Sequence, residues 1–285
     1  MFTTALVALD LSPAEAAMLD CLGDLKDLGV ARVILTHVIR VGYAQGAGFG
    51  KETDYGAWLD RRAAPLRAAG LEVAVDIRAS GEPAAEILAC AAEHHADLIV
   101  IGSRGQNMVR GLFLGSTARE VIRQSRLPVR LEWIESDGRD DAPDCARACD
   151  GGLTRLMLAT DFSPHAAAAE AAAARLAAHA GGVDLVHVLT DADCARYPRW
   201  PVMARAALGA IADEVAASGG KADLHLPAGR PSEEIARMAE ACEAQLIVVG
   251  KHGRNWVRSM VIGSTAENLC EIARRPVLMV PLQEG

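Results

Sequence analysis

The sequence predicts an α/β protein made of two repeated, doubly wound domains, each built on a parallel sheet flanked by helices. The first observation is length, because 285 residues fit two domains of ~100–200 residues each better than one. The second is that the chain repeats itself. The third is that short β-branched runs alternate with alanine-rich stretches in each half, a pattern typical of βαβ units around a buried parallel sheet.

The repeat is visible in two pairs of segments. Ala5–Pro13 (ALVALDLSP) matches Leu156–Pro164 (LMLATDFSP), and Gly81–Ile87 (GEPAAEI) matches Gly229–Ile235 (GRPSEEI). The second pair is separated by 148 residues, and this separation stays constant as far as the last predicted strand. The two halves therefore share one architecture, and their length difference lies mainly in the middle of each half.

The first half alternates strands and helices from its start. Apolar, β-branched runs predict strands at Ala5–Leu9, Val33–Val38, Glu72–Ile77, Leu98–Ile101 and Val129–Trp133. The stretches between them predict helices at Pro13–Leu28, Thr53–Ala69, Pro83–His94 and Ser116–Ser125. Ser12-Pro13 and its counterpart Ser163-Pro164 mark helix starts, because a hydroxyl caps a helix and proline suits the first helical position.

The segment Glu135–Gly152 (ESDGRDDAPDCARACDGG) separates the halves. It is acidic, punctuated by glycine and proline, and without apolar periodicity, which predicts a linker. The expected domains are therefore 1–134 and 153–285, with the linker at 135–152. Cys145 and Cys149 have the spacing of one helical turn and could bind zinc, but two thiolates without a second pair or a nearby histidine do not favour a metal site.

Composition limits the function classes. Hydrophobic residues at 51% and charged residues at 23% are typical of a soluble globular chain. The net charge of −8 argues against a nucleic-acid binder, which needs a basic face. No apolar run approaches the ~18 residues of a membrane span, and Met1–Asp10 has no secretory signal. Seven cysteines, an odd number, fit reduced thiols. We expect a cytoplasmic protein that binds neither nucleic acid nor membrane.

A glycine pattern recurs after the fourth strand of each half. Gly102–Gly105 (GSRG) is followed after nine residues by Gly115–Thr117 (GST), and Gly250–Gly253 (GKHG) is followed at the same spacing by Gly263–Thr265 (GST). A glycine after a buried strand lets the backbone turn and approach a ligand. The second cluster places hydroxyls and main-chain N–H groups at a helix N-terminus, where anions are stabilised. The pattern predicts a phosphate site at the carboxyl edge of each sheet.

Other interpretations of the glycines are weaker. A single G-x-x-G commonly makes only a tight turn, but this pattern occurs twice, each time between an apolar strand and a helix. The G-x-x-x-x-G-K-[ST] motif of Walker-type NTPases is absent from the sequence. Gly46–Gly50 (GAGFG) lacks the glycine spacing of a dinucleotide fingerprint and is expected to be a loop.

The combined motif resembles the universal stress protein family in its tandem two-domain form. The resemblance rests on G-x₂-G-x₉-G-[ST], on the aspartate that ends the first strand, and on the proline and valine that begin the last one. It covers nearly the whole chain apart from the linker and the loops in the middle of each half. It implies a five-stranded parallel sheet flanked by helices in each domain, ATP bound at the glycine loop, and stress-linked regulation.

The resemblance also implies roles for single residues. Asp10 and Asp161 would approach the ribose and adenine, and the backbones of Val38 and Val188 would meet the adenine. The first glycines of each half would follow the ribose and phosphates, namely Gly102, Gly105, Gly250 and Gly253. The later cluster would hold the phosphates, namely Gly115, Ser116, Thr117, Gly263, Ser264 and Thr265.

The strand-end aspartates can also be interpreted from charge alone. A carboxylate beside a phosphate site repels the phosphate, so Asp10 and Asp161 suit ribose hydroxyls or a Mg²⁺ ion better than phosphate. The alternative is that they cap the first helix of each half through Ser12 and Ser163. We favour the ligand role.

The second half departs from the first at the rim of its predicted site. Ser259 stands where the first half has Gly111, and Cys194–Pro201 (CARYPRWP) has no counterpart. His37 and His187 recur inside the second strand, where packed side chains with satisfied nitrogens are expected. Four basic residues could reach phosphates or lie on a solvated loop, namely Arg104, Arg110, Lys251 and Arg258.

These observations predict a cytoplasmic regulatory protein whose bound ATP, with Mg²⁺, biases loop order and contacts with a protein partner. The final strands, Val129–Trp133 and Val277–Val280, resemble edge strands that pair domains in that family. We therefore expect a pseudo-twofold arrangement within the chain, and a homodimer of chains. Two alternatives stay open: a carrier of a lipid, metal or other small ligand in one half, and a slow ATPase or other nucleotide-using enzyme. No nucleophile elbow or Ser-His-Asp arrangement is visible, so a dedicated enzyme is not expected.

Overall fold

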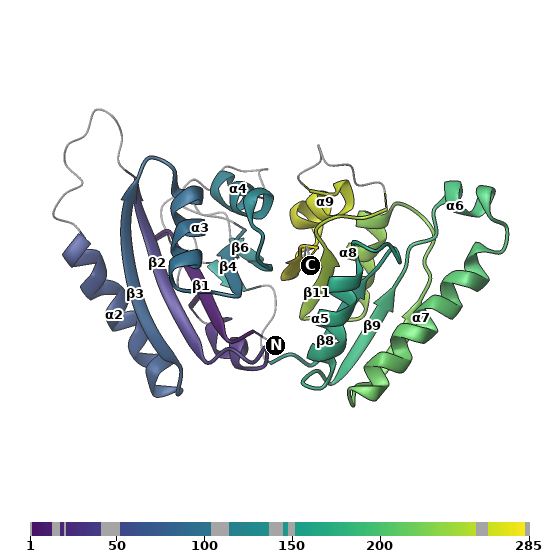
Figure 1. Ribbon diagram of the computed structural model, residues 1–285, viewed down its shortest axis with the longest axis horizontal. Helices are drawn as coiled ribbons and strands as arrows, with labels where there is room; N and C mark the ends of the chain where they lie inside the picture. Colours follow the sequence, from purple (N-terminus) through teal and green to yellow (C-terminus); the bar gives the residue numbers. More distant parts are fainter. Residues whose placement is uncertain are drawn as a thin grey trace. The chain divides into compact units, whose positions relative to one another are not determined.

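The chain divides into two compact units, Phe2–Arg147 and Ala148–Gly285, drawn in Figure 1 from purple to teal and from teal to yellow. The computed structural model describes residues 2–12, 18–19, 21–40, 52–103, 114–136, 145–147, 152–254 and 262–282. Each unit contains a parallel sheet flanked by helices, as the sequence predicts. Within the described residues, no helix combines the length and the apolarity needed to span a membrane.

The N-terminal unit has five parallel strands in the order β5-β4-β1-β2-β3. They are β1 (Thr4–Leu9), β2 (Arg32–Arg40), β3 (Glu72–Ser80), β4 (Leu98–Gly102) and β5 (Val129–Glu132). All five predicted strands are therefore present, and β2 and β3 run further than predicted. The central strands form because their apolar residues are covered on both faces, as for Leu6 and Val7 of β1 and Val100 of β4, each 0% exposed.

Three of the four predicted helices of this unit are confirmed, and one is corrected. The confirmed helices are α2 (Glu52–Ala68), α3 (Pro83–Glu93) and α4 (Ser116–Gln124). The helix predicted over Pro13–Leu28 is wrong in its second part, where the chain forms the 3₁₀ helix η1 (Cys21–Lys26). Gly23 lies inside η1, and glycine weakens an α-helix, while Gly29 with φ of 89° turns the chain directly after it.

The C-terminal unit repeats this topology with the strand order β10-β9-β8-β11-β12, all parallel. Its strands are β8 (Arg155–Ala159), β9 (Gly182–Val186), β10 (Ala222–His225), β11 (Leu246–Gly250) and β12 (Val277–Val280). Its helices are α5 (Ala167–Ala177), α6 (Asp191–Arg196), α7 (Trp200–Ala217), α8 (Pro231–Ala241) and α9 (Ser264–Ile272). The short helix α6 begins the stretch that has no counterpart in the first half.

Part of the predicted linker forms regular structure. Ile134–Ser136 (β6) pairs antiparallel with Cys145–Arg147 (β7). Cys145 therefore lies in a strand, and the helical spacing proposed for Cys145 and Cys149 is wrong at its first member; Cys149 lies outside the described residues. A strand places successive side chains on opposite faces, so it does not support the one-turn spacing on which the zinc alternative depended.

The topology determines where a ligand can bind in each unit. The chain moves outward from β1 through β2 to β3, and then returns to the other side of β1 to form β4 and β5. Because the crossovers are right-handed, the helices that follow the return of the chain to β4 lie on the other face of the sheet from the helices that precede it. Helix α3 packs against α4, and α8 packs against α9. The crevice between the carboxyl ends of β1 and β4, and of β8 and β11, is where open α/β sheets bind ligands.

Candidate functional site

The first site residue of the N-terminal unit lies at this crevice. Asp10 directly follows β1, and Gly102 ends the neighbouring β4, where Ala8 pairs with Ile101. The Asp10 Oδ1 atom accepts a hydrogen bond from the Ser12 main-chain N–H at 3.1 Å. Leu11 between them has a left-handed φ of 59°. Asp10 therefore stabilises the turn after β1, while the start of the helix that it was expected to cap, from Pro13, lies outside the described residues.

The later glycine cluster is held against the end of β4 by main-chain hydrogen bonds. The Ser103 N–H donates to the Glu132 carbonyl at 2.8 Å, and the Gly115 N–H donates to the Ser103 carbonyl at 2.9 Å. Helix α4 then begins at Ser116 with Gly115 as its cap residue in an extended conformation. Its first N–H groups point out of the helix without intrahelical partners, as an anion site requires. Gly105 and the rest of 104–113 lie outside the described residues.

Arg40 adds a positive charge to this cradle that the sequence did not suggest. It ends β2, and its Nη2 atom donates to Thr117 Oγ1 in the first turn of α4 at 3.1 Å. Arg40 is separated from Thr117 by 77 positions, so no motif spacing could have revealed the contact. Of the basic residues that the sequence did suggest, Arg104, Arg110 and Arg258 lie outside the described residues.

The C-terminal unit repeats the same main-chain bonds. Asp161 Oδ1 accepts the Ser163 N–H at 3.0 Å, with Phe162 between them at φ of 58°. The Lys251 N–H donates to the Val280 carbonyl at 2.8 Å, and the Gly263 N–H donates to the Lys251 carbonyl at 2.8 Å. Helix α9 begins at Ser264, and Thr265 follows in its first turn. The scaffold of the two predicted phosphate sites is therefore the same.

The glycines that end β11 are close to their neighbours. A Cβ atom on Gly250 would lie 3.1 Å from the His252 carbonyl oxygen, and one on Gly253 would lie 2.6 Å from Asp161 Oδ2. A side chain at Gly253 would therefore displace the Asp161 carboxylate. Gly250 and Gly253 are therefore required because neighbouring atoms approach their backbone too closely for a side chain. Gly115 differs, since a Cβ there would lie 3.7 Å from the Ser103 carbonyl oxygen, which is an ordinary contact.

The recurring histidines are packed, as predicted. His37 Nδ1 lies 2.9 Å from the Leu9 carbonyl oxygen, and His187 Nδ1 lies 2.9 Å from the Thr160 carbonyl oxygen. Burial lowers the pKa of both imidazoles below the usual 6.5, against the raising effect of these main-chain contacts. Both are therefore neutral at pH 7, and each ties the end of its strand to the neighbouring one. The predicted adenine contacts Val38 and Val188 each follow one of them directly.

Lys251 lies inside the second glycine loop and is 6% exposed. Burial lowers its pKa from the usual 10.5 to about 8. The charged form of the Lys251 side chain is thus less stable than that of an exposed lysine. An anion beside the ammonium group would stabilise this charged form. The matched residue in the first half is Ser103, whose Oγ accepts the Ile134 N–H at 3.1 Å. The two loops therefore differ in charge at this position.

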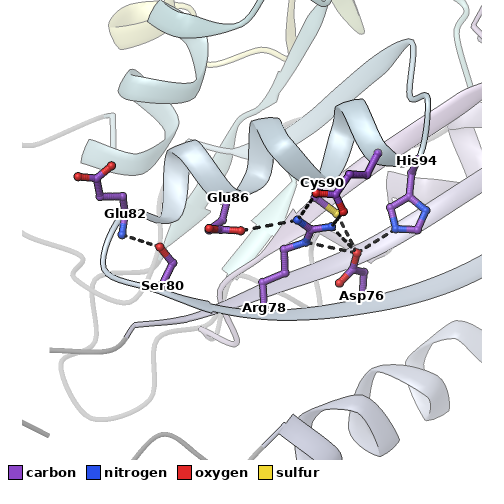
Figure 2. A network of polar contacts seen from close by, with 8 residues as sticks. Asp76, Arg78, Ser80, Glu82, Glu86, Cys90 and His94 are labelled. Atoms are coloured by element: carbon purple, nitrogen blue, oxygen red, sulfur yellow. Dashed lines mark hydrogen bonds and ion pairs between the residues drawn. The ribbon is translucent and has the colours of Figure 1, made fainter. Parts of the chain in front are cut away.

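Two further polar networks lie outside the predicted sites. Asp76 and Arg78 of β3 meet Cys90 of α3 and His94, the residue that caps its C-terminus, and the Arg78 guanidinium also pairs with Glu86 (Figure 2). Glu93 forms a further ion pair with Arg78. Although burial opposes ionisation, hydrogen bonds from Arg78 and His94 hold the pKa of Asp76 below its usual range. Burial raises the pKa of the Cys90 thiol to about 11.

The second network has the same residue types from different positions, with Asp184, His225 and Cys242 around Arg155. Aspartate, cysteine and histidine could ligate a metal ion in either network. In each, however, a guanidinium already bonds the carboxylate, at 2.9 Å for Arg78 and 2.6 Å for Arg155. Because that cation neutralises the aspartate, we interpret both networks as structural ties within their units.

Comparisons with known proteins agree with this architecture. A universal stress protein of Mycolicibacterium smegmatis is 29% identical over 218 residues, which cover 74% of this chain and 69% of that protein. One of Mycobacterium tuberculosis H37Rv is 29% identical over 198 residues, 65% of this chain and 61% of the relative's own length. The chain therefore matches only part of these longer relatives.

Solved structures match nearly the whole chain. A universal stress protein from Archaeoglobus fulgidus DSM 4304 covers 98% of both chains with a TM-score of 0.76 and 24% identity. A functionally unknown protein from Pseudomonas aeruginosa PAO1 covers 99% of this chain and 93% of its own, with a TM-score of 0.68 and 18% identity. These two likenesses concern the fold. The model of the universal stress protein family matches twice, over residues 1–131 and 152–281, and the chain thus belongs to that family, in its tandem two-domain form.

Proposed function

We propose that this protein is an ATP-binding regulator of the stress response that holds a nucleotide at the glycine loops of its halves. The observation that carries the proposal is the repeated cradle. In both units the loop after the fourth strand is tied back by the same two main-chain bonds, from Ser103 and Gly115 and from Lys251 and Gly263. Each cradle places a helix N-terminus at the crevice where α/β sheets bind ligands.

The residues present fit a phosphate chain. The first turns of α4 and α9 offer main-chain N–H groups and the hydroxyls of Ser116 and Ser264. Arg40 brings positive charge to Thr117 at the start of α4 in the first half, and the second half has the buried Lys251 in its glycine loop. Charge-assisted hydrogen bonds of this kind contribute ~1.5–3 kcal/mol each, which suits micromolar affinity after the entropy of association is subtracted. Gly250 and Gly253 allow the close approach of His252 and Asp161 at the end of β11.

The residues fit Mg²⁺ less well. Asp161 is the acidic side chain of the second half for which we considered a metal role. Its two oxygens, however, accept main-chain N–H groups at 3.0 and 2.7 Å. A carboxylate that is already bonded to two amides is a weaker metal ligand. In the proposed complex, Mg²⁺ is therefore held by phosphate oxygens and water rather than by this aspartate.

Calorimetric titration of the full chain with ATP tests the proposal. ATP is expected to bind with micromolar affinity, and AMP, which lacks most of the phosphate tail, is expected to bind at least tenfold more weakly. Gly115→Val and Gly263→Val, which fill the cradles, should each remove the contribution of one half. Gly56→Val and Gly209→Val are matched controls, because a Cβ on either helical glycine meets nothing within 4 Å. ATP binding that survives in the double cradle variant would contradict the site assignment.

The proposal includes the setting of the protein. We place its two domains at 1–134 and 153–285 and expect the chain in the cytoplasm. We expect the final strands to pair the two domains in a pseudo-twofold arrangement within the chain, and we expect a homodimer of chains. Light scattering of the full chain and cell fractionation test these points. Release of a partner protein on addition of ATP, measured by co-purification from cells under stress, tests the regulatory role.

A further inference from the structure

Arg254 ties the second glycine loop to Asp161 and to helix α6. Its main-chain N–H donates to Asp161 Oδ2 at 2.7 Å. Its guanidinium donates to both carboxylate oxygens of Asp193 in α6, Nη1 to Oδ1 at 3.1 Å and Nη2 to Oδ2 at 2.8 Å. Such a two-bond pair fixes geometry as well as charge. The side chains are 36% and 20% exposed, so the pair is only partly screened by water.

An aromatic cluster packs against the Arg254 side of this ion pair. The guanidinium carbon of Arg254 lies 5.6 Å from the ring centre of Trp200, the first residue of α7. The Trp200 indole N–H donates to His187 Nε2 at 3.2 Å. Phe162 stacks on the His187 ring with centres 4.4 Å apart, and its ring centre lies 6.3 Å from that of Trp200. The Arg254 cation therefore lies against the Trp200 ring, which itself packs against His187 and Phe162.

These contacts lie at the strand ends where the ligand is predicted to bind. Asp161 and Phe162 follow β8, His187 follows β9, and Arg254 follows β11. The three strand ends that would meet ribose and adenine are thus joined to one another and to α6. Each oxygen of Asp161 already accepts one main-chain N–H group, and a carboxylate oxygen has two lone pairs, so a ribose hydroxyl would share this carboxylate with both amides.

The first half has a different set of residues at these positions. Gln106 corresponds in sequence to Arg254 and carries no charge, and Cys194–Pro201 has no counterpart. The part of the first half that the structure describes does repeat the aromatic contact to the strand histidine, since Tyr55 of α2 lies edge-on to His37 with ring centres 5.3 Å apart. An aromatic contact to the strand histidine thus occurs in both halves, while the first half has an uncharged residue at the sequence position of Arg254.

We propose that Asp161, Arg254 and Asp193 form a latch that holds the nucleotide site of the C-terminal half closed, so that ATP binds more tightly to the N-terminal half. The inference rests on the proposed function, because it concerns the same two sites. The latch opens when Arg254 leaves Asp193, and ATP binding at the second half must supply that energy. Two carboxylates facing the loop add repulsion toward an incoming triphosphate while the latch is closed.

The latch itself is tested without nucleotide, by amide hydrogen exchange of the full chain. Asp193→Asn removes the charge and preserves the shape of the side chain. It is expected to speed exchange at least fivefold at the Arg254 amide and in α6. Asp191→Asn, in the same helix and exposed, is the matched control and should leave both unchanged. Unchanged exchange at Arg254 in Asp193→Asn would overturn the latch.

The effect on affinity is tested by ATP titration with the first cradle filled by Gly115→Val. In that background, Asp193→Asn and Arg254→Gln are each expected to tighten ATP binding about fivefold, the value of one partly exposed ion pair. With Gly263→Val instead, neither should matter. Weaker binding in Arg254→Gln would overturn the proposal and make Arg254 a phosphate ligand. If exchange rises as expected but no variant binds ATP, the latch stands and the proposed nucleotide function is wrong.

Discussion

Replacing Asp184 by asparagine is expected to destabilise the C-terminal unit by about 2 kcal/mol. Asp184 lies in β9 and is 0% exposed. Its oxygens accept from Arg155 Nε at 3.0 Å and Nη2 at 2.6 Å, and His225 Nε2 lies 2.8 Å from Oδ1. Asparagine has nearly the same shape but offers one acceptor oxygen and no charge, so at least one of these bonds is lost.

The magnitude follows from how each partner is exposed. Removing one member of a fully buried ion pair costs about 3–5 kcal/mol, because the other charge is left without a partner. Arg155 is 35% exposed and also lies 3.2 Å from Asp223, so its charge keeps both water and a second carboxylate. This reduces the expected loss to about 2 kcal/mol. Asp223 is itself 66% exposed, and Asp223→Asn should therefore cost less than about 1 kcal/mol.

Urea unfolding followed by circular dichroism measures the difference. With a slope of about 2 kcal/mol per molar urea, Asp184→Asn should lower the midpoint by ~1 M, and Asp223→Asn by less than half of that. Equal, small shifts in the two variants would refute the reasoning, because they would mean that burial gives Asp184 no special weight. A large shift in Asp223→Asn alone would place the important ion pair at the surface.

Three further predictions concern titrating groups. Burial raises the pKa of Cys90 to about 11 and that of Cys270 to about 12. Neither thiol should therefore react with iodoacetamide at pH 8 in the folded chain, whereas the half-buried Cys194 should react. Mass spectrometry identifies the labelled cysteines. Burial lowers the pKa of His187, so the unfolded chain binds more protons than the folded one below pH 6.5; stability should fall as the pH drops from 7 to 5, and less in His187→Gln, as urea unfolding at both pH values would measure. Burial lowers the pKa of Lys251 to about 8, so Lys251→Met should raise the melting temperature at pH 7. This gain should shrink as the pH rises above 8, because the folded wild-type lysine then loses its proton. A gain that stays constant across that pH range would contradict the burial argument.

The sequence predicts the strands well because their signal is local. Runs such as Leu98–Ile101 are apolar and β-branched throughout, which leaves a buried strand as the consistent interpretation. The hairpin of β6 and β7 was missed because a chain rich in Asp, Gly and Pro carries no such signal, and its pairing depends on residues that lie apart in the sequence. The 3₁₀ helix η1 was missed for the opposite reason: its apolar residues recur at helical spacing, yet Gly23 changes the hydrogen-bonding pattern.

The candidate site was likewise predictable only in part: the sequence indicated its main-chain cradle but not the long side chains around it. The glycine spacing predicted the cradle, because glycines mark tight turns and close approach, as at Gly250 and Gly253. The side chains that no motif indicated, Arg40 and Arg254, contact residues 77 and 61 positions away. A long, charged side chain has no preferred sequence environment, so only the folded chain reveals its partner. The departure noted at Cys194–Pro201 marked this region in part, since it includes the end of α6 and Trp200 but not Asp193.

The comparison between the two halves gives the strongest reason to treat their sites as different. The main-chain bonds of the cradle agree to within 0.1 Å, at 2.9 Å for Gly115 to Ser103 and 2.8 Å for Gly263 to Lys251. Main-chain geometry of this kind is set by the fold and survives many substitutions. The side chains around it changed freely, from Ser103 to Lys251 and from Gln106 to Arg254. A repeated protein that needed two equal sites would keep the side chains as well as the scaffold, so we expect the ligand affinities of the halves to have diverged while their architecture stayed the same.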